Sequence, residues 1–192
     1  METPQNQGNI RPNPFGDRPR IDPSAYVDAS AQIIGKVVIG PRVFVAPGAI
    51  IRADEPDQDG HVHPVEIGEE CNIHDGVIIH APAGAKVWIG PRTSLTHGAL
   101  VHGPARIGAD CFLGIRAMVI GASLEESVWV GVGATVLDIA IPSHSFVPGR
   151  SMINTSDKVA NLRAATDEDD AFQRKQVAMN QSLREGYLKL GS

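Results

Sequence analysis

The chain has 192 residues and a formal net charge of −5, from 17 Lys and Arg against 22 Asp and Glu. It has no cluster of basic residues and few aromatic residues, so we expect no nucleic-acid partner. No apolar run reaches the roughly 18 residues of a membrane-spanning helix, and the N-terminus is unlike a secretion signal, so we expect no membrane partner and a cytoplasmic location.

Residues 1–20 are polar and contain Pro4, Pro12, Pro14 and Pro19. A segment of this composition has little apolar surface to bury. We therefore expect an extended or disordered N-terminal lead over residues 1–20.

The next segment, residues 21–155, repeats with a period of six. From Val27 onward an aliphatic residue occupies every sixth position, with two breaks before Val119. The unbroken runs are Val27, Ile33, Ile39, Val45 and Ile51, then Ile67, Ile73 and Ile79, and then Ile89, Leu95, Val101, Ile107, Leu113 and Val119. A period of six fits a chain that turns a corner after each short strand and closes a triangular coil after three strands. The content of 18 Val and 18 Ile against 9 Leu also favours strands.

This repeat predicts an all-β fold, a parallel β-helix over residues 21–155. Its aliphatic residues would point inward and its coils would stack about 4.8 Å apart. A β-sandwich is the alternative, and the constant phase argues against it. The hexapeptide pattern resembles the left-handed parallel β-helix superfamily, which also includes many acyltransferases, and this resemblance implies the left-handed sense. The two breaks insert loops at residues 54–66 and 81–86, and loops on a rigid scaffold often carry function.

From about Asp157 the period becomes that of a helix. Large side chains recur at spacings of three and four, at Phe172, Gln176, Met179, Leu183, Tyr187 and Leu190. Thr166 and Asp169 have the spacing of a capping box. We expect residues 156–192 to form a C-terminal helical segment with an amphipathic helix packed along the solenoid.

The six-residue phase also places polar residues relative to one another. Ile51, Ile79 and Val101 are separated by whole coils, so they should stack on one face. The residues that follow them, Arg52, His80 and His102, should then form an outward column in which both imidazoles can reach one ion. His97 should lie near the corner of the preceding face.

Three histidines with an open fourth position are a ligand set of catalytic zinc, and three imidazoles also suit iron(II) or cobalt. Ordinary surface histidines are the alternative. The spacing alone leaves open whether His97 reaches the same ion within one chain.

Three segments resemble the gamma-class carbonic anhydrases, including the catalytic-type domain of carboxysomal organising proteins. They are IRADE at residues 51–55, NIHDGVIIHA at residues 72–81 and SLTHGALVHGP at residues 94–104. The likeness extends from about residue 26 to NQSLREGY at residues 180–187, which is most of the chain.

The resemblance implies a homotrimer with metal sites between subunits. His80, His97 and His102 match the three zinc ligands, with His80 and His102 from one chain and His97 from its neighbour. Arg52 matches an arginine that holds bicarbonate and pairs across the interface with the match of Asp75.

Further positions match residues that line the family's site. Asp54, Glu55 and Asn72 are among them, Asn180 matches an asparagine from the C-terminal helix, and His74 stands where the family commonly has glutamine. The implied reaction is the reversible hydration of carbon dioxide to bicarbonate by a metal-bound hydroxide, with Glu55 orienting the attacking water.

The loop at residues 81–86 departs from the archetypal member, which has a longer acidic loop with a glutamate proposed to shuttle protons. This loop has no carboxylate, so no shuttle residue can be transferred. His61 and His63 in the other inserted loop are alternatives, and a solvated surface loop is the simpler interpretation of them.

Other functions remain open. A catalytically weak or inactive homologue would serve as an assembly or structural subunit, and a metal-dependent hydrolase is a related possibility. A hexapeptide-repeat acyltransferase would need no cluster of three histidines and should lose nothing on chelation.

The two cysteines, Cys71 and Cys111, fall in inward positions of the same face two coils apart, with Thr93 between them. That separation exceeds the reach of a disulfide. We predict two reduced, buried thiols.

Overall fold

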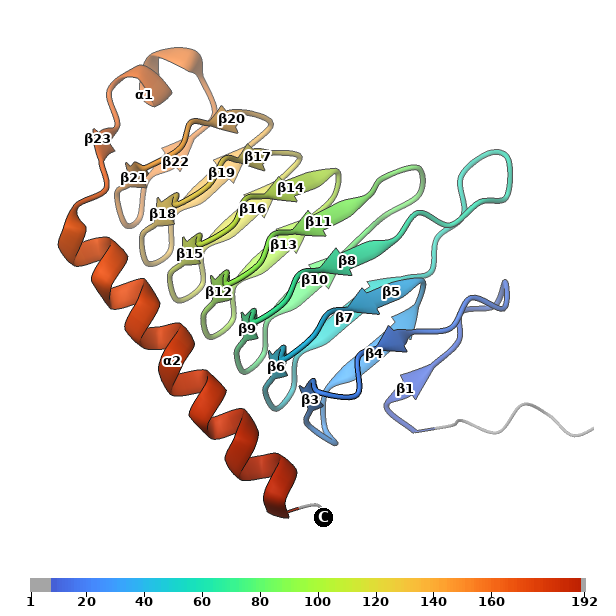
Figure 1. Ribbon diagram of the computed structural model, residues 1–192. Coiled ribbons are helices and arrows are strands. Elements are labelled where there is room, and N and C mark those ends of the chain that lie inside the picture. The colour runs from blue at the N-terminus through green and yellow to red at the C-terminus, as the bar shows by residue number, and fades with distance from the viewer. Residues whose placement is uncertain (1–7, 191–192) are drawn as a thin grey trace, which may run out of the picture.

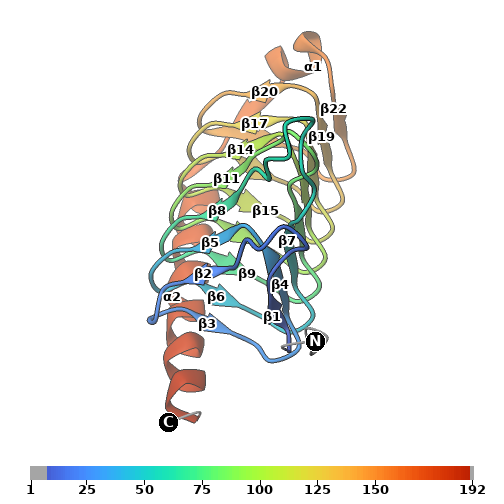
Figure 2. The same ribbon diagram turned by 90° about the vertical axis from the view of Figure 1, so that its right-hand side faces the viewer.

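The computed structural model describes residues 8–190, which form a triangular coil of short strands with a long helix along one side (Figure 1). Each turn of the coil contributes strands to three sheets, and the coils stack along one axis (Figure 2). All strand pairs in the described chain are parallel, except that β23 lies antiparallel to β21. The parallel β-helix predicted from the six-residue period is confirmed.

The strands are divided among sheets A, B and C. Sheet A contains β1 (Ile10–Arg11), β4 (Gln32–Gly35), β7 (Ile50–Ala53), β10 (Ile78–His80), β13 (Leu100–His102), β16 (Met118–Ile120), β19 (Thr135–Leu137) and β22 (Met152–Ile153). Sheet B contains β2 (Arg20–Ile21), β5 (Val37–Ile39), β8 (Val65–Ile67), β11 (Val87–Ile89), β14 (Ala105–Ile107), β17 (Ser123–Leu124) and β20 (Ala140–Ile141). Sheet C contains β3 (Tyr26–Val27), β6 (Phe44–Val45), β9 (Asn72–Ile73), β12 (Ser94–Leu95), β15 (Phe112–Leu113), β18 (Trp129–Val130), β21 (Ser145–Val147) and β23 (Arg163–Ala164).

The core is the column of aliphatic side chains inside the coil. The periodic residues from Ile33 to Val147 are buried, and Val27 in the first coil is half-buried. Small residues fill the remaining inward positions, among them Cys71 and Cys111, which are free and buried as predicted. Burial raises the pKa of each thiol to about 12, so both stay protonated at neutral pH.

Glycine is required where neighbouring coils approach closely at the corners. A Cβ on Gly90 would lie 2.6 Å from the backbone nitrogen of Ala109, and one on Gly108 would lie 2.5 Å from the carbonyl carbon of Glu125. Both glycines follow an inward isoleucine. The corner therefore admits no side chain without moving the backbone of the next coil.

The N-terminal lead that we expected over residues 1–20 is partly wrong. β1 pairs with β4, and β2 pairs with β5, so the solenoid begins before residue 21. The first strands of a solenoid otherwise leave backbone groups unpaired at its end, and this segment supplies partners for them despite its polar composition. Residues 1–7 of the predicted lead lie outside the described residues.

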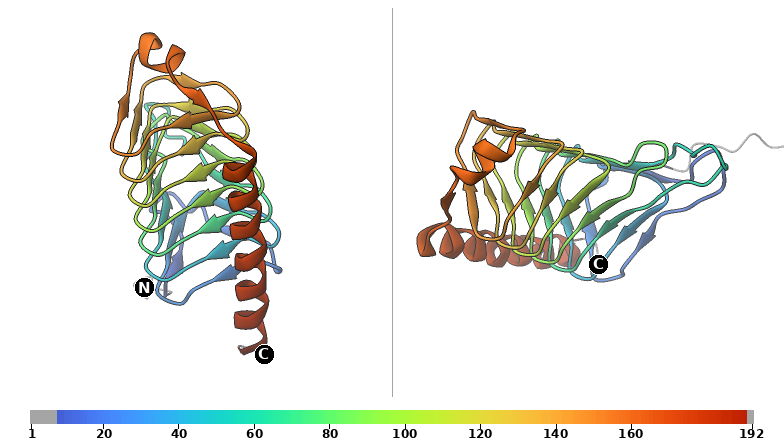
Figure 3. Two further views of the ribbon diagram at one scale, coloured as in Figure 1. Left: turned by 90° about the vertical axis from the view of Figure 1, so that its left-hand side faces the viewer. Right: turned by 90° about the horizontal axis from the view of Figure 1, so that it is seen from above.

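The C-terminal segment begins as expected at residue 156. It contains α1 (Ser156–Ala160), the short strand β23 and α2 (Asp167–Leu190), which runs beside the solenoid back toward its first coils (Figure 3). Thr166 and Asp169 form the predicted capping box: the Asp169 amide donates to Oγ1 of Thr166 at 3.2 Å, and the Thr166 amide donates to Oδ2 of Asp169 at 2.9 Å.

The face that α2 turns toward the solenoid is largely polar, which differs from the simple amphipathic prediction. Its buried residues are Gln173, Asn180 and Arg184, whereas Met179 and Leu183 are nearly half exposed. The reason is that corner carbonyls need donors: Nε2 of Gln173 donates to the Arg92 carbonyl at 2.7 Å, and Nη1 of Arg184 donates to the Ser24 carbonyl at 2.8 Å.

Aromatic contacts hold the two ends of α2. Tyr187 stacks on Tyr26 with ring centroids 4.9 Å apart, and Phe172 packs edge-on against Trp129 at 5.6 Å. Offset and edge-on aromatic pairs of this kind stabilise packing beyond simple area burial. Within residues 8–190, neither helix is long and apolar enough to cross a lipid bilayer.

Candidate metal centre

The outward column predicted from the repeat is present in sheet A. His80 is in register with Arg52 on β7 and with His102 on β13, while Ile79 behind it is in register with Ile51. The two imidazole rings meet nearly edge to face, with centroids 5.1 Å apart and an interplanar angle of 72°. Two of the predicted metal ligands therefore lie side by side on adjacent strands.

The hydrogen bond of His102 defines which of its nitrogens is free. Its Nδ1 lies 3.1 Å from the carbonyl oxygen of Gly103. Because a carbonyl only accepts, Nδ1 must carry the proton, and Nε2 retains its lone pair. A ligating histidine typically donates its other ring nitrogen to such an acceptor.

His80 presents a second free nitrogen. Its Nε2 is buried and makes no hydrogen bond within residues 8–190, although it lies at an ion-pair distance of 3.2 Å from Oε1 of Glu55. This contact lacks hydrogen-bond geometry, so it does not satisfy Nε2. Burial and, next, the nearby Arg52 cation lower the pKa of His80, which favours the neutral imidazole that metals bind.

Carboxylates surround the arginine of the column. Nε of Arg52 lies 2.9 Å from Oδ1 of Asp54, and its Nη2 lies 3.1 Å from Oε1 of Glu55. Oε2 of Glu55 also accepts a hydrogen bond from the amide of Ala83 at 3.3 Å, which joins the two inserted loops. Within one chain Arg52 is thus bound by Asp54 and Glu55, and the predicted pairing with Asp75 of a neighbour stays a prediction.

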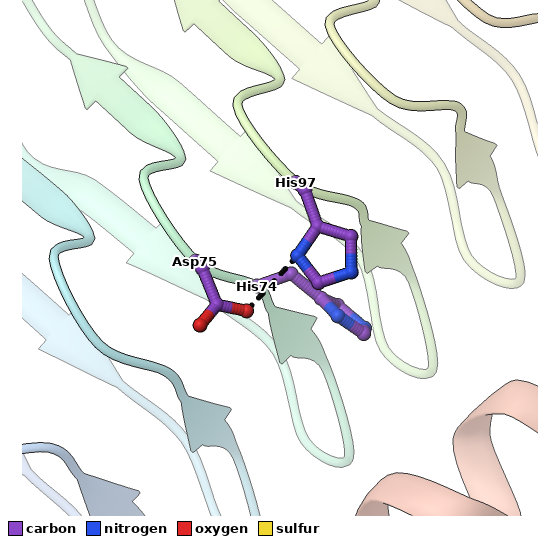
Figure 4. A group of neighbouring side chains, drawn as sticks. All are labelled: His74, Asp75 and His97. Carbon is purple, nitrogen blue, oxygen red and sulfur yellow. Dashed lines mark ion pairs between the residues drawn. The ribbon is translucent and has the colours of Figure 1, made fainter.

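His97 lies elsewhere, at the corner that follows β12. Figure 4 shows it with His74 and Asp75 from the coil before. Its Nδ1 lies 2.9 Å from Oδ2 of Asp75, and its ring centroid lies 5.0 Å from that of His74 at an interplanar angle of 81°. His97 and Asp75 are about half exposed, at 55% and 53% of their side chains, so this corner is open to another molecule.

His74 and Asn180 link this corner to the C-terminal helix. Nδ2 of Asn180 lies 3.3 Å from Nε2 of His74, and Asn180 is one of the buried residues of α2. Burial, with a contribution from His97, lowers the pKa of His74 to about 4, so the ring is neutral at physiological pH. Asn72 is fully buried beneath the helix, and its Nδ2 donates to Oγ of Ser94 at 3.0 Å.

The inserted loop has its own hydrogen bonds. Asp57 accepts from the amides of Asp59 and His61, and its Oδ2 lies 2.8 Å from Nε2 of His63. These bonds, first that from His61, lower the pKa of Asp57. His61 itself is exposed.

Two groups in the described chain have the donors of a cation site. They are His74, Asp75 and His97, and separately Asp54, Glu55 and His80, with one ligand atom from each residue within 4.8 Å of the others in its group. The free nitrogens of His80 and His102 suit a divalent transition metal such as zinc. The chain thus has a half-site with His80 and His102 and a separate corner with His74 and His97.

Sequence reasoning found the histidines but not what orients them. The Gly103 carbonyl that orients His102 is a backbone group, so no side-chain motif in the sequence indicates it. The bond from Asn180 to His74 joins residues 106 positions apart, and only the docking of α2 creates it.

The chain is similar to several known proteins. A family model described as the hexapeptide repeat of succinyl-transferase matches residues 104–137. The chain is 32% identical to a carbonic anhydrase of Methanosarcina thermophila, in an alignment that covers 91% of this chain and 77% of that one.

The chain is also 37% identical to a carboxysome assembly protein, CcmM, of Nostoc sp., over 88% of this chain. It spans only 31% of that protein's length. Among solved structures, a putative acetyltransferase of Bacillus cereus shares the fold with a TM-score of 0.81 at 21% identity, covering 94% of this chain and 97% of that one.

The match to the Methanosarcina enzyme includes most of both chains, whereas the acetyltransferase likeness concerns the fold alone. Together with the stacked histidines, the match to the Methanosarcina enzyme shows that this chain belongs to the gamma-class carbonic anhydrase family.

Proposed function

We propose that this protein catalyses the reversible hydration of carbon dioxide to bicarbonate at metal sites between the subunits of a homotrimer. The observation that carries the proposal is the in-register pair of His80 and His102, whose Nε2 atoms are free beside the Arg52 guanidinium. A surface built only for solubility has no reason to leave a buried imidazole nitrogen without a partner.

His80 and His102 of one subunit and His97 of the next would hold the metal. Zinc is our first choice, and iron(II) or cobalt would suit the same nitrogens. Such an ion lowers the pKa of bound water, so that a nucleophile is available at neutral pH.

The chain's own residues bind and orient the reactants. Arg52 keeps N–H donors beyond those held by Asp54 and Glu55, and these can hold the negative charge of bicarbonate. Glu55 lies between Arg52 and His80, where its carboxylate can accept a hydrogen bond from the attacking water and orient it. Its bond from the Ala83 amide restrains the carboxylate in this position.

The outer surface of sheet A supports the proposed trimer. Ile50, Ile78, Leu100 and Met118 are in register on adjacent strands and form an apolar column beside the histidine column. Ile78 and Met118 are more than a third exposed in the single chain. A continuous apolar column of this kind is a typical surface for burial against another subunit. Sedimentation should give a species of about three times the 20.4 kDa chain mass.

The carboxysome relatives favour a second candidate, an assembly subunit that binds metal but turns over slowly. The loop at residues 81–86 has no carboxylate that could carry protons away, and His63 in the other inserted loop is already paired with Asp57. An acyltransferase, which the fold alone would allow, predicts activity that survives chelation.

The deciding experiment is stopped-flow hydration of carbon dioxide by trimer loaded separately with zinc and with ferrous iron. His102→Ala serves as the blank, because it removes one of the two stacked ligands. Turnover above this blank supports the enzyme, and a fully metallated trimer without turnover supports the assembly subunit.

A further inference from the structure

Sheet B forms the face of the solenoid that carries neither the histidine column nor the C-terminal helix. The histidine column stands on sheet A, and α2 packs on β3, β6 and β12 of sheet C. Figure 2 shows the strands of sheet B stacked one above another. In the trimer proposed above, which forms through sheet A, the outward side chains of sheet B remain accessible to another molecule.

A tryptophan and an arginine are stacked on this face. Trp88 on β11 is in register with Arg106 on β14, and Cζ of Arg106 lies 4.2 Å from the centroid of the indole ring. Trp88 is half-buried, and Arg106 is exposed. A cation–π contact of this kind restrains the guanidinium group without using its N–H donors.

Arg106 has no anionic partner in the described part of the chain. The carboxylate beside Trp88 on this face is that of Glu66, and its Oε2 lies 2.7 Å from Nζ of Lys86. Among residues 8–190, Arg106 makes no ion pair and no side-chain hydrogen bond. Its N–H donors are therefore free for a carboxylate, which can bind a guanidinium group through two parallel hydrogen bonds.

A groove lies beside the stacked pair. The outward residues that follow Arg106 in register, Ser123 on β17 and Ala140 on β20, are small. The groove has a volume of about 720 Å³, and it is lined by Trp88, Arg106, Ser123 and Ala140 together with Asp138, which lies between β19 and β20. It is open along the sheet, so a small molecule would leave much of its surface in water, whereas an extended peptide could lie across the strands.

The two unpaired charges of the groove are separated along the solenoid axis. Arg106 is on β14, and Asp138 lies at the corner that leads to β20, two coils further on. Asp138 likewise makes no ion pair within residues 8–190. Stacked coils are about 4.8 Å apart, so the two groups are roughly 10 Å apart along the axis, which an extended peptide spans in about three residues. A segment with an acidic and a basic side chain at that spacing would complement both charges.

We propose that this groove on sheet B binds an extended segment of a partner protein, with an acidic side chain of the segment on Arg106 and a basic side chain on Asp138. Pro104, Ala122 and Ile139 add apolar lining that can cover the aliphatic parts of the segment. Tryptophan and arginine are also enriched among the residues that dominate the affinity of protein interfaces. The proposal is independent of turnover, because none of these residues belongs to the metal centre.

The first test finds the chemistry of the segment without assuming its sequence. A library of short random peptides displayed on phage is selected on the immobilised full chain at low salt. We expect the enriched peptides to carry an acidic and a basic residue at the spacing derived above. Enrichment of peptides without this pair of charges, or no enrichment at all, would overturn the proposal.

Variants then locate the bound peptide. Fluorescence anisotropy of a labelled, selected peptide should show affinity about 10-fold or more weaker for Arg106→Gln, as expected for loss of hydrogen bonds between charged groups. Arg174→Gln is the matched control, because it makes the same change at an exposed arginine of α2, and its affinity should equal that of the unmodified protein. Equal affinities of the two variants would place the peptide elsewhere and contradict the proposal.

A spectroscopic measurement needs no variant of Arg106. Trp88→Phe assigns the two indole N–H signals in a proton–nitrogen spectrum of the protein. The Trp88 signal should shift when the peptide is added, whereas that of Trp129, which packs against Phe172 of α2, should not. A Trp88 signal that stays in place at saturating peptide would overturn the proposal.

Other occupants of the groove would give different results. Sodium acetate that displaces the peptide at millimolar concentration would indicate a site for free anions and overturn the proposal. Sedimentation that shows trimers associating further, and less so in Arg106→Gln, would indicate that a second copy of this chain fills the groove and would also overturn it. Trimers that stay separate and keep the peptide in acetate support the proposed partner.

Discussion

Two neighbouring isoleucines on β10 should lose very different amounts of stability on the same substitution. Ile79 points inward and is fully buried between Ile51 and Val101, whereas Ile78 points outward and is 39% exposed. Replacing Ile79 by alanine removes three buried carbons, at about 0.8 kcal/mol each. The ladders on both sides hold the strand in place, so the cavity cannot collapse, and we expect a total loss of about 3–4 kcal/mol in the free energy of unfolding.

Urea unfolding monitored by circular dichroism measures this loss, at several protomer concentrations. The cost of Ile79→Ala should be independent of concentration. Ile78→Ala should cost under about 1 kcal/mol within the chain, and any further cost should shrink on dilution if Ile78 lies between subunits, because dissociated chains no longer make the contact. Loss of less than about 1 kcal/mol for Ile79→Ala, with an unchanged m-value, would refute the rigid-core argument.

Three more predictions concern the metal, the thiols and the helix. His102→Ala should abolish stoichiometric metal binding while exposed His144→Ala retains it, and elemental analysis that finds equal metal in both would remove His102 from the ligand set. Because the pKa of Cys71 and Cys111 is raised from 9.0 to about 12, the unfolded chain loses these protons first, so the free energy of unfolding should fall as the pH rises above 9. The double alanine variant should show a shallower decline, and a decline of the same slope would contradict the burial of the thiols. Thr166→Ala should cost about 1 kcal/mol by removing the cap of α2, seen as faster amide exchange in its first turn, whereas Ser182→Ala on the exposed side of the helix should leave that turn unchanged.

The sequence determined the features that depend on local period. Because the coil closes after a whole number of hexapeptides, the phase of the aliphatic residues fixes which side chains point inward. It therefore predicted the stacking of Ile51, Ile79 and Val101, and from that the outward stacking of Arg52 and His80. The capping box of α2 could also be predicted from the sequence, since its two partners are three residues apart.

Tertiary structure decided whatever depends on contacts between distant segments. The polar N-terminal segment has no sequence repeat. It forms β1 and β2 by pairing with β4 and β5, which lie at the end of the solenoid. The face that α2 buries is set by the corner carbonyls beneath it rather than by its own apolar residues. In the same way, the contact between Asn180 and His74 joins residues 106 positions apart and forms only when α2 packs on the solenoid. A hydrogen bond requires a specific orientation of donor and acceptor, and groups on distant segments take up that orientation only after the chain has folded.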